Sequence, residues 1–312
     1  MKILVTGGAG FIGSNLVEEL AKDKDNKIIV IDNLSVTSRN VPLLKKWGVE
    51  FYKMDIGNFS EIKDVFAGID TVFHLAAMNR AQRSIQNPLE ANKTNIDGTI
   101  NCLESAKSAG VGRFVFVSSS SVYAGQKNKL LTEDMPLFPL HPYGVGKLAG
   151  EHYARIYYSL YGLRTIILRF FSVYGPRQLG DIDNAAVIPK FIDAIINDRP
   201  VEVYGDGEQT RNFTFVKDVV ACAIEASRNE KTVGDVFNIA SEDEVSVNQI
   251  LMEISKRLHK KPLIEYQPSL KGDPLRNPAD IQKAKTILGR IPKIKIDEGI
   301  RITVEEYLKN SG

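Results

Sequence analysis

Short apolar runs alternate with amphipathic stretches along the first 170 residues of the chain. Between the apolar runs, residues recur at helical spacing, most clearly at 11–23, 95–110 and 143–162. Near-continuous apolar strands that alternate with helices predict a parallel sheet covered on both faces, a doubly wound α/β (Rossmann) fold. Ligands of such a fold lie at the carboxyl ends of its strands. The predicted strands are 2–6, 27–32, 49–55, 69–77, 113–121 and 164–170.

After about residue 172 this alternation gives way to short mixed segments and frequent prolines. The stretches 211–227 and 235–240 still have the pattern of a helix and a strand that return to the first domain. We therefore expect two interleaved units. The first comprises residues 1–171 and about 212–240, and a smaller mixed α/β lobe comprises about 172–211 and 241–312.

Composition narrows the class of protein. The 312 residues include 40 basic and 38 acidic side chains, a balance that indicates neither a nucleic-acid nor a membrane surface. No apolar run approaches the roughly 18 residues of a membrane span, and the N-terminal segment lacks a signal-peptide pattern, so we expect a cytoplasmic protein. The two cysteines and four scattered histidines offer no disulfide framework and no metal-ligand spacing.

A glycine-rich turn, GGAGFIG at residues 7–13, links the first predicted strand to the first helix. In that context Gly8-x-Gly10-x-x-Gly13 predicts a dinucleotide site, because the bare backbone and the helix N-terminus can receive a pyrophosphate. Asp32 closes the next strand, where a carboxylate accepts hydrogen bonds from the adenosine ribose. A 2′-phosphate would be repelled there, so the pattern favours NAD over NADP.

Tyr143 and Lys147 stand four positions apart just after Pro142, on one face of a predicted helix. A free tyrosine has a pKa of about 10 and is a poor base at neutral pH. A lysine ammonium one turn away stabilises the phenolate and lowers that pKa. Residues 118–121 are serines at the end of the fifth predicted strand, and one hydroxyl there would complete an acid–base device for alcohol–ketone interconversion.

Tyr123 and Lys127 repeat the same spacing twenty residues earlier. Gly125 between them disfavours a helical register, and Lys127 begins a polar run that is typical of a solvated loop. We therefore predict that the pair of Tyr143 and Lys147 takes part in the chemistry.

With these motifs in place, the chain resembles the extended short-chain dehydrogenase/reductase family, in its NAD-dependent sugar-nucleotide epimerase and dehydratase branch. The resemblance covers nearly the whole chain and rests on motifs that occur in the family's order. They are TGGAGFIGSNL, DNLS, HLAA, NIDGT, VSSSSVYA, PYGVGKLAGE, LRFFSVYGPRQ, YGDGEQTRNFTFVKDVV and FNIAS.

The resemblance implies a role for each matched position. Ser119 falls on the catalytic serine or threonine, with Tyr143 as the base and Lys147 as the group that tunes it. Arg211 would grip the nucleotide diphosphate and Phe171 would lie beside the nicotinamide. The implied NAD contacts are Gly7, Gly10, Phe11, Ile12, Asp32, Asn33, Asp55, Ile56, Leu75, Ala76, Ala77, Asn95, Tyr143, Lys147 and Phe171. The implied substrate contacts are Ser119, Ser121, Ser172, Val187, Tyr204, Arg211, Lys271, Asp273 and Asn277.

Two positions distinguish between the activities found in this branch of the family. The 4,6-dehydratases carry an acidic pair, and the glucuronate decarboxylases a glutamate, where this chain has Ser120 and Ser121. What remains is oxidation and re-reduction at C4, so the resemblance implies a UDP-hexose 4-epimerase. Tyr143 would take the 4-hydroxyl proton as hydride passes to NAD, and hydride would return to the other face of a transient 4-keto sugar.

Several positions depart from the 4-epimerase pattern. Ser172 replaces an asparagine, Leu270 a diphosphate-binding arginine beside Lys271, and Asn212 an aspartate.

Asn277 falls on a gatekeeper beside the sugar C2 substituent that is often tyrosine in enzymes restricted to plain hexoses. Asparagine leaves room for an N-acetyl group, although it could instead merely cap a turn between two prolines.

Alternatives remain at this stage. Another nucleotide-sugar epimerase or a dTDP-glucose 4,6-dehydratase-like enzyme would share most motifs, and a non-catalytic NAD-sensing protein would share the fold. His74 is expected to be a satisfied, partly buried residue rather than a catalytic one. The aromatic residues of 153–162 are expected to form core or the face of a homodimer, because family members commonly pair through this helix and the preceding one.

Overall fold

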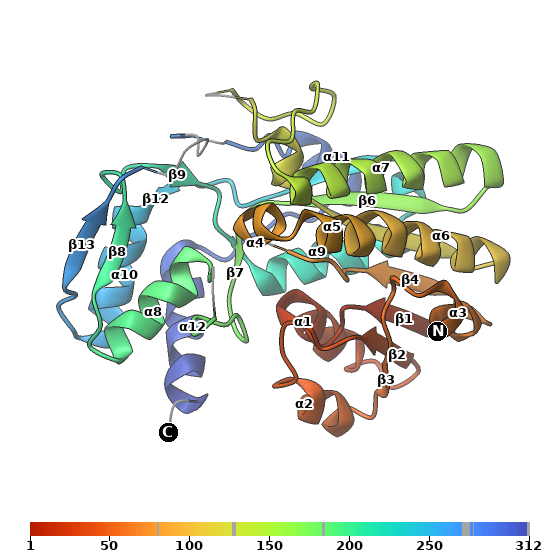
Figure 1. The fold of residues 1–312 in the computed structure, drawn as a ribbon, viewed down its shortest axis with the longest axis horizontal. Coiled ribbons are helices and arrows are strands. Elements are labelled where there is room, and N and C mark those ends of the chain that lie inside the picture. Colours follow the sequence, from red (N-terminus) through yellow and green to blue (C-terminus); the bar gives the residue numbers. More distant parts are fainter. Residues whose placement is uncertain (80, 127–128, 183–184, 270–274, 277, 311–312) are drawn as a thin grey trace.

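The structure is a computed structural model that describes residues 1–79, 81–126, 129–182, 185–269, 275–276 and 278–310. Its centre is a seven-stranded sheet in the order β11-β6-β5-β4-β1-β2-β3, and every neighbouring pair is parallel. Helices cover both faces, and a smaller lobe lies beside one end of this domain (Figure 1). The expected doubly wound fold is confirmed. The sheet strands are β1 Lys2–Thr6, β2 Lys27–Asp32, β3 Glu50–Lys53, β4 Thr71–His74, β5 Arg113–Ser119, β6 Thr165–Phe170 and β11 Val236–Ile239.

Two apolar clusters pack on the two faces of this sheet. One holds side chains from α1, α9 and the later helix α11 (Gln282–Leu288), and the other from α3, α6 and α7. The helical segments of the first 230 residues outside the small lobe are α1 Phe11–Leu20, α2 Val41–Lys46, α3 Phe59–Ile62, η1 Lys63–Phe66, α4 Ala81–Gln86, α5 Pro88–Asn92, the π-helical turn η2 Lys93–Asp97, α6 Gly98–Ser108, η3 Ser120–Tyr123, α7 Pro142–Tyr161 and α9 Val216–Arg228.

The second lobe has its own apolar core, in which α8 and α10 pack together beside α12. Its strands form short pairs, with β8 parallel to β13 and β9 antiparallel to β12. A further parallel pair is formed by β7 and β10. Strand β7 lies where the chain passes between the two units (Figure 1). These elements are β7 Val173–Tyr174, α8 Val187–Ile196, β8 Val201–Tyr204, β9 Thr210–Arg211, β10 Thr214–Phe215, β12 Val245–Ser246, α10 Val247–Leu258, β13 Ile264–Gln267 and α12 Ile296–Asn310.

The remaining C-terminal helix departs from the expected division of the chain. Helix α11, Gln282–Leu288, contacts β11, α9 and the short turn η4 Glu230–Thr232. Its Ala284 and Leu288 side chains belong to the core of the first domain. The stretch 241–312 is therefore shared between the two units, because the apolar face of this one helix finds its partner on the sheet side.

Some predicted segments end earlier in the structure than the hydrophobic pattern suggested. The fourth strand ends at His74, and residues 75–77 continue as an irregular wall that leaves their backbone at the edge of a crevice.

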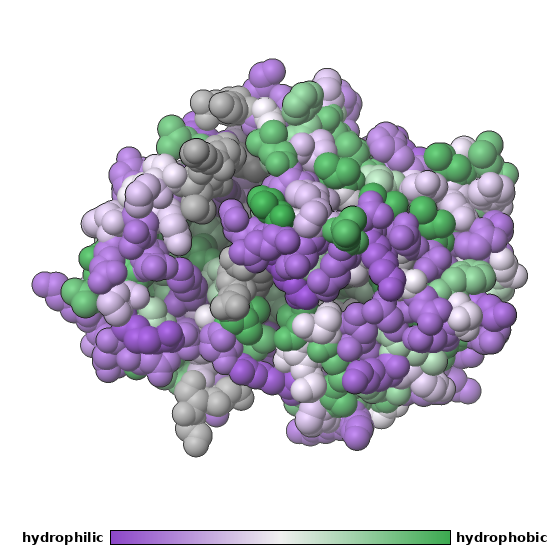
Figure 2. Space-filling view, in the orientation of Figure 1, coloured by the Kyte–Doolittle hydropathy of each residue, from purple (hydrophilic) through white to green (hydrophobic). Residues whose placement is uncertain are grey.

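On the face shown in Figure 2 the surface is mostly hydrophilic, with hydrophobic groups scattered among the polar ones. Within the described residues, no helix is long and apolar enough to cross a membrane, and no group of three or more His, Cys, Asp or Glu side chains could hold a metal.

Candidate active site

A crevice of ≈ 610 Å³ runs along the carboxyl edge of the parallel sheet. It receives residues from the ends of β1, β2, β4, β5 and β6 and from the first turns of α7. The glycine loop forms its floor. Gly7 has a φ of +71°, and a Cβ there would lie 2.7 Å from the Ala76 nitrogen. A Cβ on Gly13 would lie 2.2 Å from the Gly7 carbonyl oxygen. Both positions therefore require glycine, and the loop presents bare backbone before α1, as a pyrophosphate site needs.

Asp32 lies at the end of β2 and is fixed by two backbone amides. Its Oδ2 accepts a hydrogen bond from the Ala9 nitrogen at 3.0 Å, and its Oδ1 accepts one from the Leu34 nitrogen at 2.8 Å. Burial raises the pKa of Asp32, and these two amides act in the opposite direction. The carboxylate thus has a set orientation at the wall of the crevice, where it can accept bonds from ribose hydroxyls.

The next groups along the crevice are held in the same way. Asn33 donates to the Oδ2 of Asp55 at 3.0 Å, and Asp55 Oδ1 accepts from the Gly57 nitrogen at 2.7 Å. Ile56 and the wall residues 75–77 also line this part of the crevice. The bare loop, the fixed carboxylate and the polar and apolar walls that follow it fit a dinucleotide.

The serine turn stands at the opposite end of the crevice from Asp32. Ser119 ends β5 and caps the short helix η3, and its Oγ accepts a hydrogen bond from the Ser121 nitrogen at 3.1 Å. The two hydroxyls lie 3.2 Å apart, with Ser119 as donor and Ser121 as acceptor. Both serines line the crevice, as predicted for substrate-facing groups.

Tyr143 begins α7 directly beside this turn. Its backbone nitrogen donates to Ser84 Oγ at 3.0 Å, and its ring stacks on His141 with the ring centroids 6.0 Å apart. His141 also caps the helix, because its Nδ1 accepts from the Gly144 nitrogen at 3.2 Å. The helix start and these contacts direct the tyrosine ring toward the crevice that it lines.

Lys147 is buried one turn after Tyr143. Its Nζ donates to the Val117 carbonyl at 2.7 Å and lies 6.0 Å from the centroid of the Tyr143 ring. Burial lowers the pKa of Lys147 to about 8, and the charge of Glu151 partly offsets that effect. The ammonium is thus held within reach of the phenol, and it loses its proton more readily than an exposed lysine does.

Tyr123 has a different environment. It is the last residue of η3, is fully buried, and donates from its hydroxyl to Asn238 Oδ1 at 3.0 Å. Burial raises the pKa of Tyr123 to about 12, so its phenol stays protonated at neutral pH. Lys127 lies outside the described residues. Tyr123 is not among the residues that line the crevice, so the structure favours Tyr143 as the candidate base.

Two predicted NAD contacts need correction. Phe170, not Phe171, lines the crevice; Phe171 packs with Tyr123 in a separate apolar cluster. Adjacent residues at the end of a strand face opposite sides, so an error of one position moves the side chain out of the site. Asn95 is also buried behind the wall, where its amide holds both the nitrogen and the carbonyl of Met78, at 2.8 and 3.1 Å.

A second pocket of ≈ 290 Å³ opens from the crevice into the small lobe. Both cavities share Ser172, which has a φ of +37°. Asparagine tolerates this left-handed region better than serine does, which gives a physical reason for the asparagine usual at this position. Three predicted substrate contacts, Val187, Tyr204 and Arg211, line the second pocket. The predicted contacts Lys271, Asp273 and Asn277, with the neighbouring Leu270, lie outside the described residues.

Asn212, the departure beside Arg211, has a structural role. It is buried, its Oδ1 accepts from the Ala279 nitrogen at 3.0 Å, and its Nδ2 donates to the Ser241 carbonyl at 2.9 Å. An aspartate could accept the first bond but could not donate the second. The amide therefore suits this chain's own packing.

His74 has hydrogen-bond partners on both ring nitrogens, as expected, but it is completely buried rather than partly buried. Its Nδ1 lies 2.8 Å from Thr6 Oγ1 and its Nε2 lies 3.1 Å from Thr99 Oγ1. Burial lowers the pKa of His74 to about 3, and the charge of Lys147 adds to the shift. The ring is neutral at physiological pH and supports the sheet edge.

Gln178 is a site residue that the sequence predictions missed. It lines both cavities and is only 6% exposed, and among the described residues its Oε1 has no hydrogen-bond partner. The neighbouring Arg177 is held by Glu18 Oε2 at 2.8 Å and lines the crevice. Both belong to the motif LRFFSVYGPRQ, but no spacing rule marks its last two residues as ligand contacts. Other missed residues of the crevice include Ser35, Val36, Thr37, Met78, Asn79, Arg83 and Leu179.

Comparisons with known proteins agree with this geometry. The chain is 37% identical over 319 residues to a UDP-glucuronate 4-epimerase of Thermodesulfobacterium geofontis, across 98% of this chain and 96% of the relative. The crystal structure of a UDP-glucose 4-epimerase from Thermotoga maritima with UDP-glucose superposes with a TM-score of 0.93 at 34% identity, and both chains are covered completely. A UDP-N-acetylglucosamine 4-epimerase from Methanobrevibacter ruminantium, in complex with UDP-N-acetylmuramic acid, gives a TM-score of 0.93 at 33% identity, across 99% of this chain and 98% of the other.

The sequence model of the NAD dependent epimerase/dehydratase family matches residues 3–240. This span contains the glycine loop, the serine turn and the tyrosine–lysine helix described above. The chain belongs to the NAD dependent epimerase/dehydratase family.

Proposed function

We propose that the chain is an NAD-dependent UDP-hexose 4-epimerase. The observation that carries this proposal is the convergence of Ser119, Tyr143 and Lys147 on the dinucleotide crevice, next to a pocket in the second lobe. Ser120 and Ser121 line the same crevice at the positions where dehydratases and decarboxylases carry acids. The site thus offers an acid–base pair for C4 and no carboxylate at these two positions to remove water or assist loss of a carboxyl group.

NAD would be held by the loop around Gly7 and Gly10, by Asp32 and by the apolar wall of the crevice. When bound, its nicotinamide accepts a hydride from the sugar and later returns it. Tyr143 takes the proton of the sugar 4-hydroxyl and gives it back, and the ammonium of Lys147 stabilises its phenolate form. Ser119 hydrogen-bonds the same oxygen. Epimerisation requires the 4-keto sugar to present its other face before the hydride returns.

The second pocket is the proposed site of the nucleotide part of the substrate. Arg211 supplies a guanidinium for the diphosphate and Tyr204 supplies an aromatic wall. The similar proteins named above act on glucose, glucuronate or N-acetylglucosamine forms of UDP-sugars. We propose UDP-glucose and UDP-galactose as substrates, together with their N-acetylated counterparts.

The direct test is to incubate the purified protein separately with UDP-glucose, UDP-N-acetylglucosamine, UDP-glucuronate and dTDP-glucose and to identify the products by NMR. Formation of the C4 epimers supports the proposal. A 4-keto-6-deoxy product would instead identify a 4,6-dehydratase, and a pentose product a decarboxylase. The absence of any product, with NAD bound, would favour an NAD-sensing protein.

Cofactor retention gives a second test. An epimerase regenerates its NAD in each cycle, so release of the cofactor serves no purpose, and a closed site protects the keto intermediate from side reactions. The protein should copurify with NAD and turn over without added cofactor. Strict dependence on added NAD, with net accumulation of NADH, would indicate a dehydrogenase.

A homodimer is the assembly that we infer. Helix α7 carries exposed apolar residues along one face, with Val145 48%, Ile156 42% and Leu160 71% exposed. These residues are separated by whole helical turns, so they form one stripe that a second copy could cover. Light scattering should give twice the mass of the chain, and Leu160→Asp should shift the protein toward the monomer.

A further inference from the structure

The turn that presents Ser119 and Ser121 is short and weakly held by its own backbone. Helix η3 spans only Ser120–Tyr123, and its closing bond, from the Ala124 nitrogen to the Ser121 carbonyl, is 3.4 Å long. A 3₁₀ turn has poor hydrogen-bond geometry, so it depends on tertiary contacts for its position. Val122 and Tyr123 provide them, since both side chains are fully buried while the serines face the crevice.

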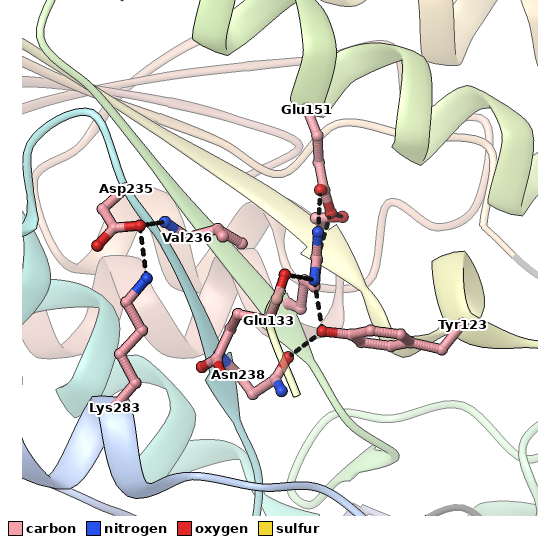
Figure 3. Close-up of polar contacts among 9 residues, drawn as sticks. Tyr123, Glu133, Glu151, Asp235, Val236, Asn238 and Lys283 are labelled. Atoms are coloured by element: carbon pink, nitrogen blue, oxygen red, sulfur yellow. Dashed lines mark hydrogen bonds and ion pairs between the residues drawn. The ribbon is translucent and has the colours of Figure 1, made fainter. Parts of the chain in front are cut away.

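Tyr123 is the polar anchor of the turn. Its hydroxyl donates to Asn238 Oδ1 at 3.0 Å (Figure 3). The same hydroxyl accepts a hydrogen bond from Nη1 of Arg169. The guanidinium carbon of Arg169 lies 4.8 Å from the centroid of the tyrosine ring. The Asn238 amide in turn donates to the Leu131 carbonyl at 3.0 Å and to the Asp280 carbonyl at 3.2 Å. The phenol is therefore fixed from two sides in the interior.

Arg169 continues this chain of contacts to the catalytic helix. Its Nε and Nη2 donate to the two carboxylate oxygens of Glu151, at 2.9 and 2.6 Å, and both side chains are almost completely buried. Glu151 lies one helical turn after Lys147 on α7. It also accepts a hydrogen bond at 2.5 Å from Ser118, the residue before Ser119. One guanidinium thus joins the serine turn to the helix that carries Tyr143 and Lys147.

We propose that Tyr123 is a positioning residue that, through Arg169, sets the serine turn against the tyrosine–lysine helix. The proposal rests on the proposed function in one respect, namely that Ser119 contacts the substrate. Without the Tyr123 hydroxyl, Asn238 Oδ1 would lose its hydrogen-bond donor and Arg169 would lose one acceptor. Both groups are buried. The phenylalanine ring would still fill the space of the tyrosine ring. Buried groups that lose a partner are costly, and the cheapest response is a shift of the turn. A displacement of about 1 Å in a reacting group can cost about 10²-fold in rate.

The experiment is a double-mutant cycle of Tyr123→Phe with Ser119→Ala, in the full-length protein with bound NAD. Tyr123→Phe alone should lower kcat about tenfold and leave KM for the sugar nucleotide within about twofold, as expected for partial misplacement. In the Ser119→Ala background the same change should cost less than about twofold, because the group that it positions is gone. The pH profile should keep its shape, since Tyr123 transfers no proton.

Tyr157→Phe is the matched control. Tyr157 is also buried, and its hydroxyl donates one side-chain hydrogen bond, to Glu104 Oε2 at 2.9 Å, where the Tyr123 hydroxyl makes two. Tyr157 lies near the far end of α7, away from the serine turn. This variant should lower the unfolding temperature by an amount similar to Tyr123→Phe and leave kcat unchanged. Equal kcat for the two variants, or a Tyr123→Phe loss that persists in full without Ser119, would overturn the proposal and leave Tyr123 a purely structural residue.

Amide hydrogen exchange separates this proposal from the proposed function, because it needs no turnover. Tyr123→Phe should speed exchange in residues 119–124 and leave the last turns of α7 unchanged, whatever the substrate. Unchanged exchange in that turn would refute the positioning role. Full turnover after Ser119→Ala, in contrast, would refute the catalytic assignment of Ser119 and with it the link to activity.

Discussion

The two connected cavities differ in how the chain builds them. The crevice is formed by residues at the ends of neighbouring parallel strands, so its groups come from short motifs with fixed positions relative to the sheet. The second pocket is assembled from α8, β8, β9 and loops of a lobe whose strands are two to four residues long. A regular sheet edge constrains its ligands closely, whereas a pocket of short segments can change its contacts without altering the fold.

This difference suggests a division of labour within the proposed enzyme. Side chains of the crevice are held by buried partners, as Lys147 is by the Val117 carbonyl and Asp32 by two amides. Changes there should affect every substrate alike. Changes in the second pocket should alter the affinity for one nucleotide sugar relative to another and leave the chemistry intact.

The largest effect is expected at Tyr143. Tyr143→Phe removes the proton-transferring group and leaves the ring, so turnover of every substrate should fall by about 10²–10⁴-fold. NAD released from the denatured variant should match the wild-type amount. Tyr123→Phe provides the comparison and should be much less impaired. Equal losses in the two variants would contradict the assignment of Tyr143 as the base.

The next effect concerns alkaline pH. Burial lowers the pKa of Lys147 from 10.5 to about 8, so the ammonium that stabilises the Tyr143 phenolate is lost above that pH. Turnover of all substrates should fall there, by about tenfold per pH unit once the lysine is mostly neutral. Lys147→Arg keeps the charge to much higher pH, so its slower turnover should show no such decline.

Thermal unfolding distinguishes this decline from denaturation. Between pH about 8 and 10.5 the unfolded chain keeps the Lys147 proton that the folded chain has lost, so this group's contribution to the free energy of unfolding rises with pH. An unfolding temperature that drops in parallel with turnover would show that loss of the fold, not deprotonation of Lys147, causes the decline.

The crevice at the regular sheet edge could be predicted from the sequence more completely than the pocket of short segments. Strands β1 and β2 were predicted with their observed bounds, and the positions of Gly7, Asp32 and Tyr143 follow from strand–turn–helix patterns. Phe171 was misplaced because the family motif contains two adjacent phenylalanines, and the sequence alone does not show which of them faces the crevice. Gln178 was missed because its site exists only once two cavities meet beside it. Long-range packing of this kind leaves no periodic trace along the chain.

A substitution at Arg211 would measure how much the second pocket contributes to substrate affinity. The Nη1 of Arg211 donates to the Thr210 carbonyl at 2.7 Å, and the side chain lines the pocket. Arg211→Met should raise KM for UDP-sugars with little change in kcat, because a hydrogen bond to a charged group contributes about 1.5–3 kcal/mol. Initial-rate kinetics with UDP-sugars would measure both constants. Inhibition by UMP serves as the control, because UMP keeps the nucleoside and only one of the two phosphates. A fall in kcat at unchanged KM would place Arg211 in the chemical step instead.

The smallest and most selective effect is expected at Asn277, which the family resemblance places at the gatekeeper position beside the C2 substituent. Asparagine is much smaller than the tyrosine usual in enzymes restricted to plain hexoses, and its amide can hydrogen-bond an N-acetyl group. The wild-type protein should therefore epimerise UDP-N-acetylglucosamine as well as UDP-glucose. Asn277→Tyr should depress turnover of the N-acetylated substrate by an amount equivalent to about 1–3 kcal/mol, the usual cost of overfilling a pocket, and spare UDP-glucose. If the wild-type protein shows no activity on N-acetylated sugars, the interpretation of Asn277 as a gatekeeper is wrong. Substrate selection would then belong to the residues that line the second pocket.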